Sequence, residues 1–86
     1  MYSVVLKSTA VKQLRKLPSK DQGRIRSAID HLAEDPFCGK TMRGECKGIF
    51  SIRIWPYRIL YVIQKKILTV TVITIGHRKD VYKKLQ

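Results

Sequence analysis

Apolar side chains in the first part of the chain change their spacing from one segment to the next. Residues 2–7 (YSVVLK) are rich in β-branched and aromatic side chains and predict a strand. Residues 8–17 repeat their apolar positions with the helical period, which predicts a short helix that is capped by Ser8 or Thr9 and stopped by Pro18. The stripe that this helix is expected to bury consists of Ala10, Val11, Leu14 and Leu17.

A second helix is predicted directly afterwards, over residues 19–35. Ser19 and Gln22 have the spacing of a capping box, and Pro36 ends the helix because the residue before a proline avoids the helical conformation. The apolar positions of this segment also follow the helical period and are Ile25, Ala28, Ile29, Leu32 and Ala33. Together the two segments predict a helical hairpin.

The remainder of the chain has the pattern of a sheet. A loop with three glycines is expected over residues 36–48, and a turn at Lys65 and Lys66 separates the last two of three strands. These strands are expected at residues 49–55, 57–64 and 67–75, and a short helix or tail follows at 79–85. The order β-α-α-β-β-β predicts an α+β fold, in which a mostly antiparallel sheet carries both helices on one face.

Composition narrows the class of protein. With 86 residues, of which 44% are hydrophobic and 28% charged, residues 1–86 are expected to form a single globular domain. The chain has 18 Lys and Arg against 6 Asp and Glu, a formal net charge of +12, and four of the six acids lie in residues 21–35. A field of this sign attracts polyanions, so nucleic acid is the first candidate partner.

Several other classes are disfavoured. The longest apolar stretch, residues 67–75, is shorter than the roughly 18–20 residues that span a bilayer, and the N-terminus lacks the pattern of an export signal. We therefore expect no membrane association and a cytoplasmic location, where the two cysteines stay reduced. A zinc set of Cys38, Cys46, His31 and His77 has no finger or knuckle spacing, so no metal and no cofactor are expected.

Three arginines are the best candidates for binding chemistry. Arg53 and Arg58 lie inside predicted strands, and Arg78 follows the last one. An arginine in a strand normally pairs with a carboxylate or reaches the sheet edge, but residues 50–86 offer Asp80 as their single acidic side chain. The three guanidinium groups therefore predict a site for phosphate.

RNA cleavage by the RNA's own 2′-hydroxyl has requirements that this region could meet. The phosphate must be held in line, charge on its oxygens must be stabilised, and two protons must be moved. Arginines supply the first two functions, and His77 is the candidate proton carrier because an unperturbed imidazole has a pKa near ~6.5. Tyr82 is expected to stack on a base or orient it. The alternative for His77 is an exposed member of a basic patch.

Other clusters are less specific. Lys7, Lys12, Arg15 and Lys16 line one side of the first predicted helix, either as a solvated face or as a contact for ribosomal RNA. Trp55 and the tyrosines are interpreted as core residues, because aromatic side chains are large apolar fillers first.

The order of motifs resembles that of a known family over essentially the whole chain. The segments AVKQLRKLP, MRGECKGIFSIRI, YRILYVI and LTVTVITIGHRKDVY are similar in sequence and order to the RelE/ParE superfamily of toxins from type II toxin–antitoxin pairs. YRILY and IGHRKDVY together are the most specific of them. The resemblance implies a compact sheet with two N-terminal helices, and an acidic, RelB-like antitoxin that forms a hetero-oligomer with the toxin.

The RelE branch of this superfamily implies residue roles. Its members cleave mRNA in the ribosomal A site, and Arg58 matches their phosphate-stabilising arginine, Arg78 their proposed general acid, and Tyr82 the tyrosine that orients RNA. Arg53 matches the second of two basic residues in the preceding strand, whereas Ser51 stands where a lysine is the proposed general base. Residues expected to contact RNA around these are Lys47, Ser51, Lys79 and Lys83.

The departure at Ser51 leaves alternatives open. The base is unassigned, and either His77 or the ribosome's own RNA could supply it. The leading hypothesis is a ribosome-dependent endoribonuclease whose partners are mRNA and the 16S rRNA around the A site. The others are a ParE-like inhibitor of DNA gyrase without nuclease activity, and an RNA-binding homologue that has lost catalysis.

Overall fold

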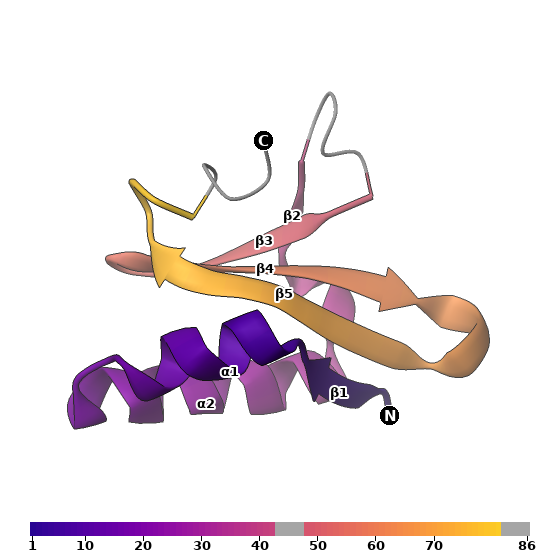
Figure 1. Ribbon diagram of the computed structural model, residues 1–86. Helices are drawn as coiled ribbons and strands as arrows, with labels where there is room; N and C mark the ends of the chain where they lie inside the picture. Colours follow the sequence, from indigo (N-terminus) through magenta and orange to yellow (C-terminus); the bar gives the residue numbers. More distant parts are fainter. Residues whose placement is uncertain (43–47, 82–86) are drawn as a thin grey trace.

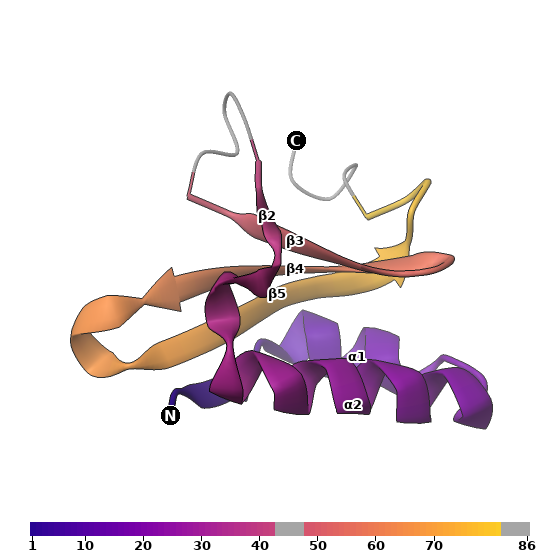
Figure 2. The ribbon, with the colours of Figure 1, turned by 180° about the vertical axis from the view of Figure 1, so that it is seen from behind.

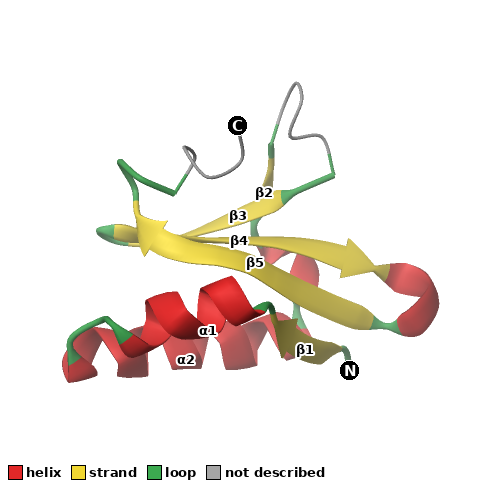
Figure 3. Ribbon diagram, in the orientation of Figure 1, coloured by secondary structure: helices red, strands yellow, loops and turns green. Residues whose placement is uncertain are grey.

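The computed structural model describes residues 1–42 and 48–81. The helices and strands, shown in Figures 1 and 3, are β1 (Ser3–Leu6), α1 (Ser8–Arg15), α2 (Ser19–Glu34), the 3₁₀ turn η1 (Pro36–Cys38), β2 (Lys40–Thr41), β3 (Phe50–Ile54), β4 (Tyr57–Gln64), the 3₁₀ turn η3 (Lys65–Ile67) and β5 (Thr69–His77). The strands form one sheet in the order β1-β5-β4-β3-β2. β1 runs parallel to β5 and the other pairs are antiparallel. The predicted α+β fold is confirmed.

Both helices cover one face of the sheet (Figures 1 and 2). Between the layers lies a core of side chains that are at most 9% exposed: Ala10 and Leu14 from α1, Ile25, Ala28, Ile29 and Leu32 from α2, and Ile59, Tyr61, Val70, Val72 and Ile75 from the sheet. The helical period predicted these four α2 residues, because an amphipathic helix must bury its apolar stripe; the fifth predicted position, Ala33, is only partly buried. Each large side chain buried in this way contributes about 1.5–3 kcal/mol relative to exposure.

The predicted loop at residues 36–48 begins with structure that the pattern did not show. The hydroxyl of Tyr61 donates a hydrogen bond to the carbonyl of Pro36 (2.8 Å) and accepts one from the amide of Gly39 (3.1 Å), so it fixes η1 and the start of β2. A side chain at Gly39 would collide with this hydroxyl and lie 2.8 Å from the carbonyl oxygen of Ser51. The edge strand β2 has two residues, too few to show an alternating sequence pattern. It forms because Gly39, which has no side chain, lets the backbone pass close to Tyr61 and Ser51.

The predicted helix caps are wrong. Lys7 and Pro18 occupy the N-cap positions of α1 and α2, and neither helix has a side-chain cap. Gln22 donates its amide hydrogens to the carbonyls of Leu17 (2.8 Å) and Arg15 (3.3 Å). The Gln22 side chain therefore caps carbonyl groups at the end of α1 and not the amides at the start of α2. It can do so because the connection between the two helices is short.

The connection between the last two strands also differs from the expected tight turn. η3 occupies residues 65–67, and Leu68 adopts a left-handed conformation with φ 48° before β5 begins. Ile67 and Leu68 are exposed turn residues, so β5 starts two positions later than predicted and continues through Gly76 to His77. The extension matters because it aligns Gly76 with Arg58 on β4.

The outer edge of β5 is closed by two different elements. β1 pairs with it only from Thr69 to Val72. Beyond that point the side-chain oxygen of Gln13, on α1, accepts hydrogen bonds from the hydroxyl of Thr74 (3.0 Å) and the amide of Ile75 (2.7 Å). Helix α1 thereby holds the half of β5 that leads to His77 and Arg78.

Candidate functional site

Two of the predicted arginines lie side by side in the sheet. Arg53 on β3 and Arg58 on β4 are directly opposite each other in the antiparallel register. Like charges in this arrangement repel and destabilise a sheet unless something else neutralises or separates them. Arg58 donates a hydrogen bond to the hydroxyl of Ser51 (3.4 Å), and its neighbour on β5 is Gly76, which has no side chain to compete for space.

The guanidinium of Arg53 is drawn away from Arg58 by an aromatic ring. It lies 4.8 Å from the centroid of Trp55, and the guanidinium of Arg78 lies 4.6 Å from the same centroid. Each such cation–π contact is worth about 0.5–1 kcal/mol at an exposed site. Trp55 therefore brings Arg53 and Arg78 together, although they are 25 residues apart in the sequence.

Trp55 was interpreted from the sequence as a core residue, and that is wrong. Its side chain is 50% exposed. The alternation of a strand places Arg53 and Trp55 on the same face, two positions apart, and this was the signal for the contact. The sequence did not show that Arg78 approaches the same ring, since that depends on where β5 ends.

Backbone contacts fix the turn that carries Trp55. The amide of Arg78 donates to the carbonyl of Pro56 (3.0 Å), and the guanidinium of Arg24 on α2 donates to the carbonyl of Trp55 (2.8 Å). Arg24 also forms a salt bridge with Asp21 (3.6 Å). The β3–β4 turn is thus tied both to the segment after β5 and to a helix of the other layer.

Asp21, the salt-bridge partner of Arg24, also accepts a hydrogen bond from the sheet. The hydroxyl of Tyr57 donates a hydrogen bond to its carboxylate (2.7 Å), and this bond raises the pKa of Tyr57. Within residues 1–42 and 48–81, neither Arg53 nor Arg58 forms a salt bridge with a carboxylate; the salt bridge found there is that of Arg24 with Asp21. The site consequently presents guanidinium groups whose charge is not neutralised by the described acids.

A hollow of about 210 Å³ lies in front of these arginines. It is lined by Cys38, Gly39, Lys40, Ser51, Ile52, Arg53 and Arg58. Lys40 was not among the candidates from the sequence, because only the pairing of β2 with β3, which sets it opposite Ser51, brings it here. Burial raises the pKa of the Cys38 thiol at the rim, and the Asp35 carboxylate raises it further. The hollow is therefore lined by three cations and a neutral thiol.

His77 lies in a different place from the one expected. It pairs with Tyr57 at the end of β5 and lines a second hollow of about 200 Å³, together with Gln13 and Lys16 of the α1 region. Its Nδ1 accepts a hydrogen bond from the amide of Lys79 (3.2 Å). The structure therefore brings Arg53, Arg58 and Ser51 to one hollow and His77 to another.

The remaining candidates divide into exposed and undescribed residues. Lys7, Lys12, Arg15, Lys16 and Lys79 are exposed. Lys47, Tyr82 and Lys83 lie outside the described residues.

The comparison with protein families assigns the chain. Residues 4–82 match the family described as the ParE toxin of the type II toxin–antitoxin system parDE. The chain belongs to this toxin family. Its relatives include Toxin RelG of Mycobacterium tuberculosis, which is 35% identical over 85 residues, covering 96% of this chain and 98% of the relative. Toxin RelE of the same organism is 30% identical over 84 residues, covering 95% and 87%. The protein is a type II toxin of the RelE/ParE superfamily, as its motifs predict.

Solved structures share the fold. The toxin–antitoxin complex RelBE2 of Mycobacterium tuberculosis contains a chain that is 34% identical, with a TM-score of 0.84 over 90% of this chain and 98% of that one. The isolated RelE toxin of Escherichia coli, at 24% identity, has a TM-score of 0.80 over 99% and 95% of the two chains. Among the described residues, no helix is both long and apolar enough to cross a membrane.

Proposed function

We propose that this toxin is a ribosome-dependent endoribonuclease that cleaves mRNA in the A site and so arrests translation. The observation that carries the proposal is the pair Arg53 and Arg58, which face each other across two strands without a carboxylate partner among the described residues. Guanidinium groups in fixed positions suit the oxygens of a phosphodiester. The identity to the toxins named RelG and RelE supports the same branch.

The proposed mechanism begins with the 2′-hydroxyl of the mRNA as nucleophile. Arg58, directed by its hydrogen bond to Ser51, stabilises the charge that builds on the phosphate oxygens. Arg53, with Lys40 across the hollow, binds the phosphate and holds it in line. We assign protonation of the leaving 5′-oxygen to Arg78, whose guanidinium lies against Trp55, and orientation of the base to Tyr82, as the family resemblance implies.

The general base is the open part of this mechanism. The Ser51 hydroxyl is a poor base, and it already accepts the hydrogen bond from Arg58. His77 lines the other hollow, next to Lys16. We therefore assign removal of the 2′-hydroxyl proton to a group of the ribosome, with His77, Lys47, Lys79 and Lys83 as contacts to RNA.

The proposed partner in the resting cell is an acidic, RelB-like antitoxin. The +12 charge of the chain favours an anionic polypeptide. The related toxins in RelBE2 of Mycobacterium tuberculosis and RelBE of Escherichia coli have been solved as complexes with their antitoxins. We propose a hetero-oligomer in which the antitoxin neutralises the arginines, in the cytoplasm where ribosomes are available to the released toxin.

The second candidate function is inhibition of DNA gyrase, and the ParE family match favours it. Two assays on one protein preparation separate the candidates: cleavage of mRNA on purified ribosomes, and supercoiling by gyrase. We expect cleavage with undiminished supercoiling. Inhibition of gyrase without cleavage would select the ParE-like function, and salt-sensitive ribosome binding with intact mRNA would select an inactive homologue.

A further inference from the structure

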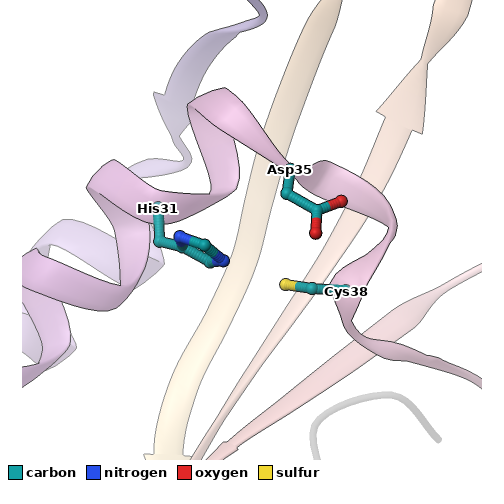
Figure 4. Close-up of side chains that lie close together, drawn as sticks. All are labelled: His31, Asp35 and Cys38. Atoms are coloured by element: carbon teal, nitrogen blue, oxygen red, sulfur yellow. The ribbon is translucent and has the colours of Figure 1, made fainter.

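Three potential metal ligands meet where α2 ends, and Figure 4 shows their side chains close together. One of them, Cys38, also lines the arginine hollow. His31 lies in the last turn of α2, Asp35 follows the helix, and Cys38 ends η1. One imidazole nitrogen, one carboxylate oxygen and the thiol sulfur all lie within 4.8 Å of one another. The zinc set considered from the sequence was different. Its Cys46 lies outside the described residues, and its His77 pairs with Tyr57, four positions along β4 from Tyr61, whose hydroxyl holds η1.

The local backbone holds the three residues in place. The amide of Asp35 donates to the carbonyl of His31 (2.9 Å), and the amide of Cys38 donates to the carbonyl of Asp35 (3.4 Å). The hydroxyl of the buried Tyr61 anchors the turn between them through the carbonyl of Pro36 (2.8 Å). Because all three ligands come from one ordered segment of eight residues, an ion would close no long loop and would fix little additional backbone.

We propose that His31, Asp35 and Cys38 form a binding site for a zinc-class divalent metal ion, with the fourth position open to solvent. Nitrogen, oxygen and sulfur are the donors that zinc takes in proteins, and a thiol with an imidazole disfavours calcium and magnesium. Bond lengths of about 2.0–2.3 Å put tetrahedral ligands roughly 3.3–3.8 Å apart. The ligand atoms lie within 4.8 Å of one another and would have to approach by about 1 Å, and all three residues are exposed. The Cys38 thiol would exchange its hydrogen bond with the Tyr61 hydroxyl for the metal ion.

The electrostatic surroundings favour a cation at this point of a basic protein. The site lies at the C-terminus of a 16-residue helix, where the helix dipole is negative. Asp30 and Glu34 are on the same final turns of α2, so three of the chain's six acidic residues are within five positions of His31. These acids offset part of the positive charge of Lys40, Arg53 and Arg58, which line the hollow that Cys38 also lines.

Metal binding would tie the end of α2 to the wall of the arginine hollow. Cys38 itself lines that hollow, and Gly39 and Lys40 directly follow it. The expected consequence is a more stable η1–β2 segment, without any part for the metal in the cleavage chemistry. The site stands independently of the proposed nuclease function.

The test is titration of untagged, reduced protein with Co²⁺, followed by competition with Zn²⁺. We expect one equivalent of Co²⁺ to produce a thiolate charge-transfer band, and Zn²⁺ to remove it. The chain has two cysteines and two histidines, so each variant has a matched control: Cys38→Ser and His31→Ala should lose the band or weaken binding, whereas Cys46→Ser and His77→Ala should keep both. A band that survives Cys38→Ser, or none in the wild type, would overturn the proposal.

A second readout does not depend on cobalt. Zn²⁺ at about 100 times its Kd should raise the Tm of the wild type by roughly 10–20 °C, since a ligand that binds only the folded state stabilises it by mass action. Asp35→Asn should reduce this shift by more than Asp30→Asn, which removes the same charge one residue from His31 but leaves the ligand set intact. Equal shifts in wild type, Cys38→Ser and Asp35→Asn would contradict the site.

Discussion

Two regions of this protein carry positive charge in different ways. On the sheet and directly after β5, Arg53, Arg58 and Arg78 are each held by a partner: Trp55 for Arg53 and Arg78, and Ser51 for Arg58. Along α1 and its flanks, Lys7, Lys12, Arg15 and Lys16 are exposed, and their side chains form no salt bridge with any residue in ranges 1–42 and 48–81. The first region has the fixed geometry that bond-making chemistry needs, whereas the second supplies attraction without direction.

The largest effect should come from removing a held arginine. Arg58→Ala deletes the guanidinium that Ser51 directs into the hollow, and we expect cleavage on the ribosome to fall by about 10²–10³-fold, the usual loss for one transition-state donor. Toxicity in growing cells should fall with it. Circular dichroism and Tm check that the variant is folded, and unchanged cleavage by folded Arg58→Ala would contradict the assignment.

Trp55→Ala tests whether holding the arginines matters beyond their charge. The variant keeps Arg53 and Arg78 but loses the ring between them, so we expect cleavage to fall by roughly tenfold while ribosome affinity changes little, the loss set by two contacts of about 0.5–1 kcal/mol each. Trp55→Phe should recover most of the activity because it restores an aromatic face. Single-turnover cleavage and a binding assay separate the two quantities. Equal loss in both variants would mean that Trp55 has another role.

The α1 region should respond to salt rather than to geometry. Lys12→Ala is expected to weaken ribosome binding a few-fold, to lower the slope of log affinity against log salt by about 1, and to leave the rate of cleavage at saturating ribosomes unchanged. Sedimentation at several salt concentrations measures the slope. Lys12→Arg, which keeps the charge, is the matched control. A fall in the saturated rate would move α1 into the catalytic region.

The smallest effect concerns Tyr61, whose hydroxyl holds η1 and the start of β2 between the proposed metal site and the arginine hollow. Burial raises the pKa of Tyr61 to about 12, so its neutral form is favoured by folding. Its contribution to stability is full below the unfolded pKa of about 10 and is lost as the pH rises through the folded value. Tyr61→Phe should therefore be less stable than wild type at pH 9, and the difference should narrow at pH 11. Urea unfolding at both pH values tests this.

The sequence predicted the layers of the fold better than the details of the site. The helical period of α2 was sufficient to predict its part of the core, because burial of a periodic stripe is what selects an amphipathic helix. In β4 the consecutive residues Ile59, Leu60 and Tyr61 are all buried, so the pattern of that strand is not a simple alternation. β2 and the path of β5 past Gly76 depend on contacts between distant segments, and so does the position of Lys40. Trp55 was misinterpreted for the same reason: it is half exposed, and its ring contacts Arg78, which comes from the segment after β5.

The central claim is that geometry, and not charge alone, makes the sheet arginines a cleavage site. Primer extension on mRNA positioned in purified ribosomes tests it with Arg58→Lys, which keeps the charge but loses the planar fork that Ser51 and a phosphate share. We predict discrete A-site cuts by the wild type and by Lys12→Arg, and a loss of at least about tenfold in Arg58→Lys, comparable to a mispositioned catalytic group. Cuts by Arg58→Lys at the wild-type rate, or their absence in the wild type, would contradict the account.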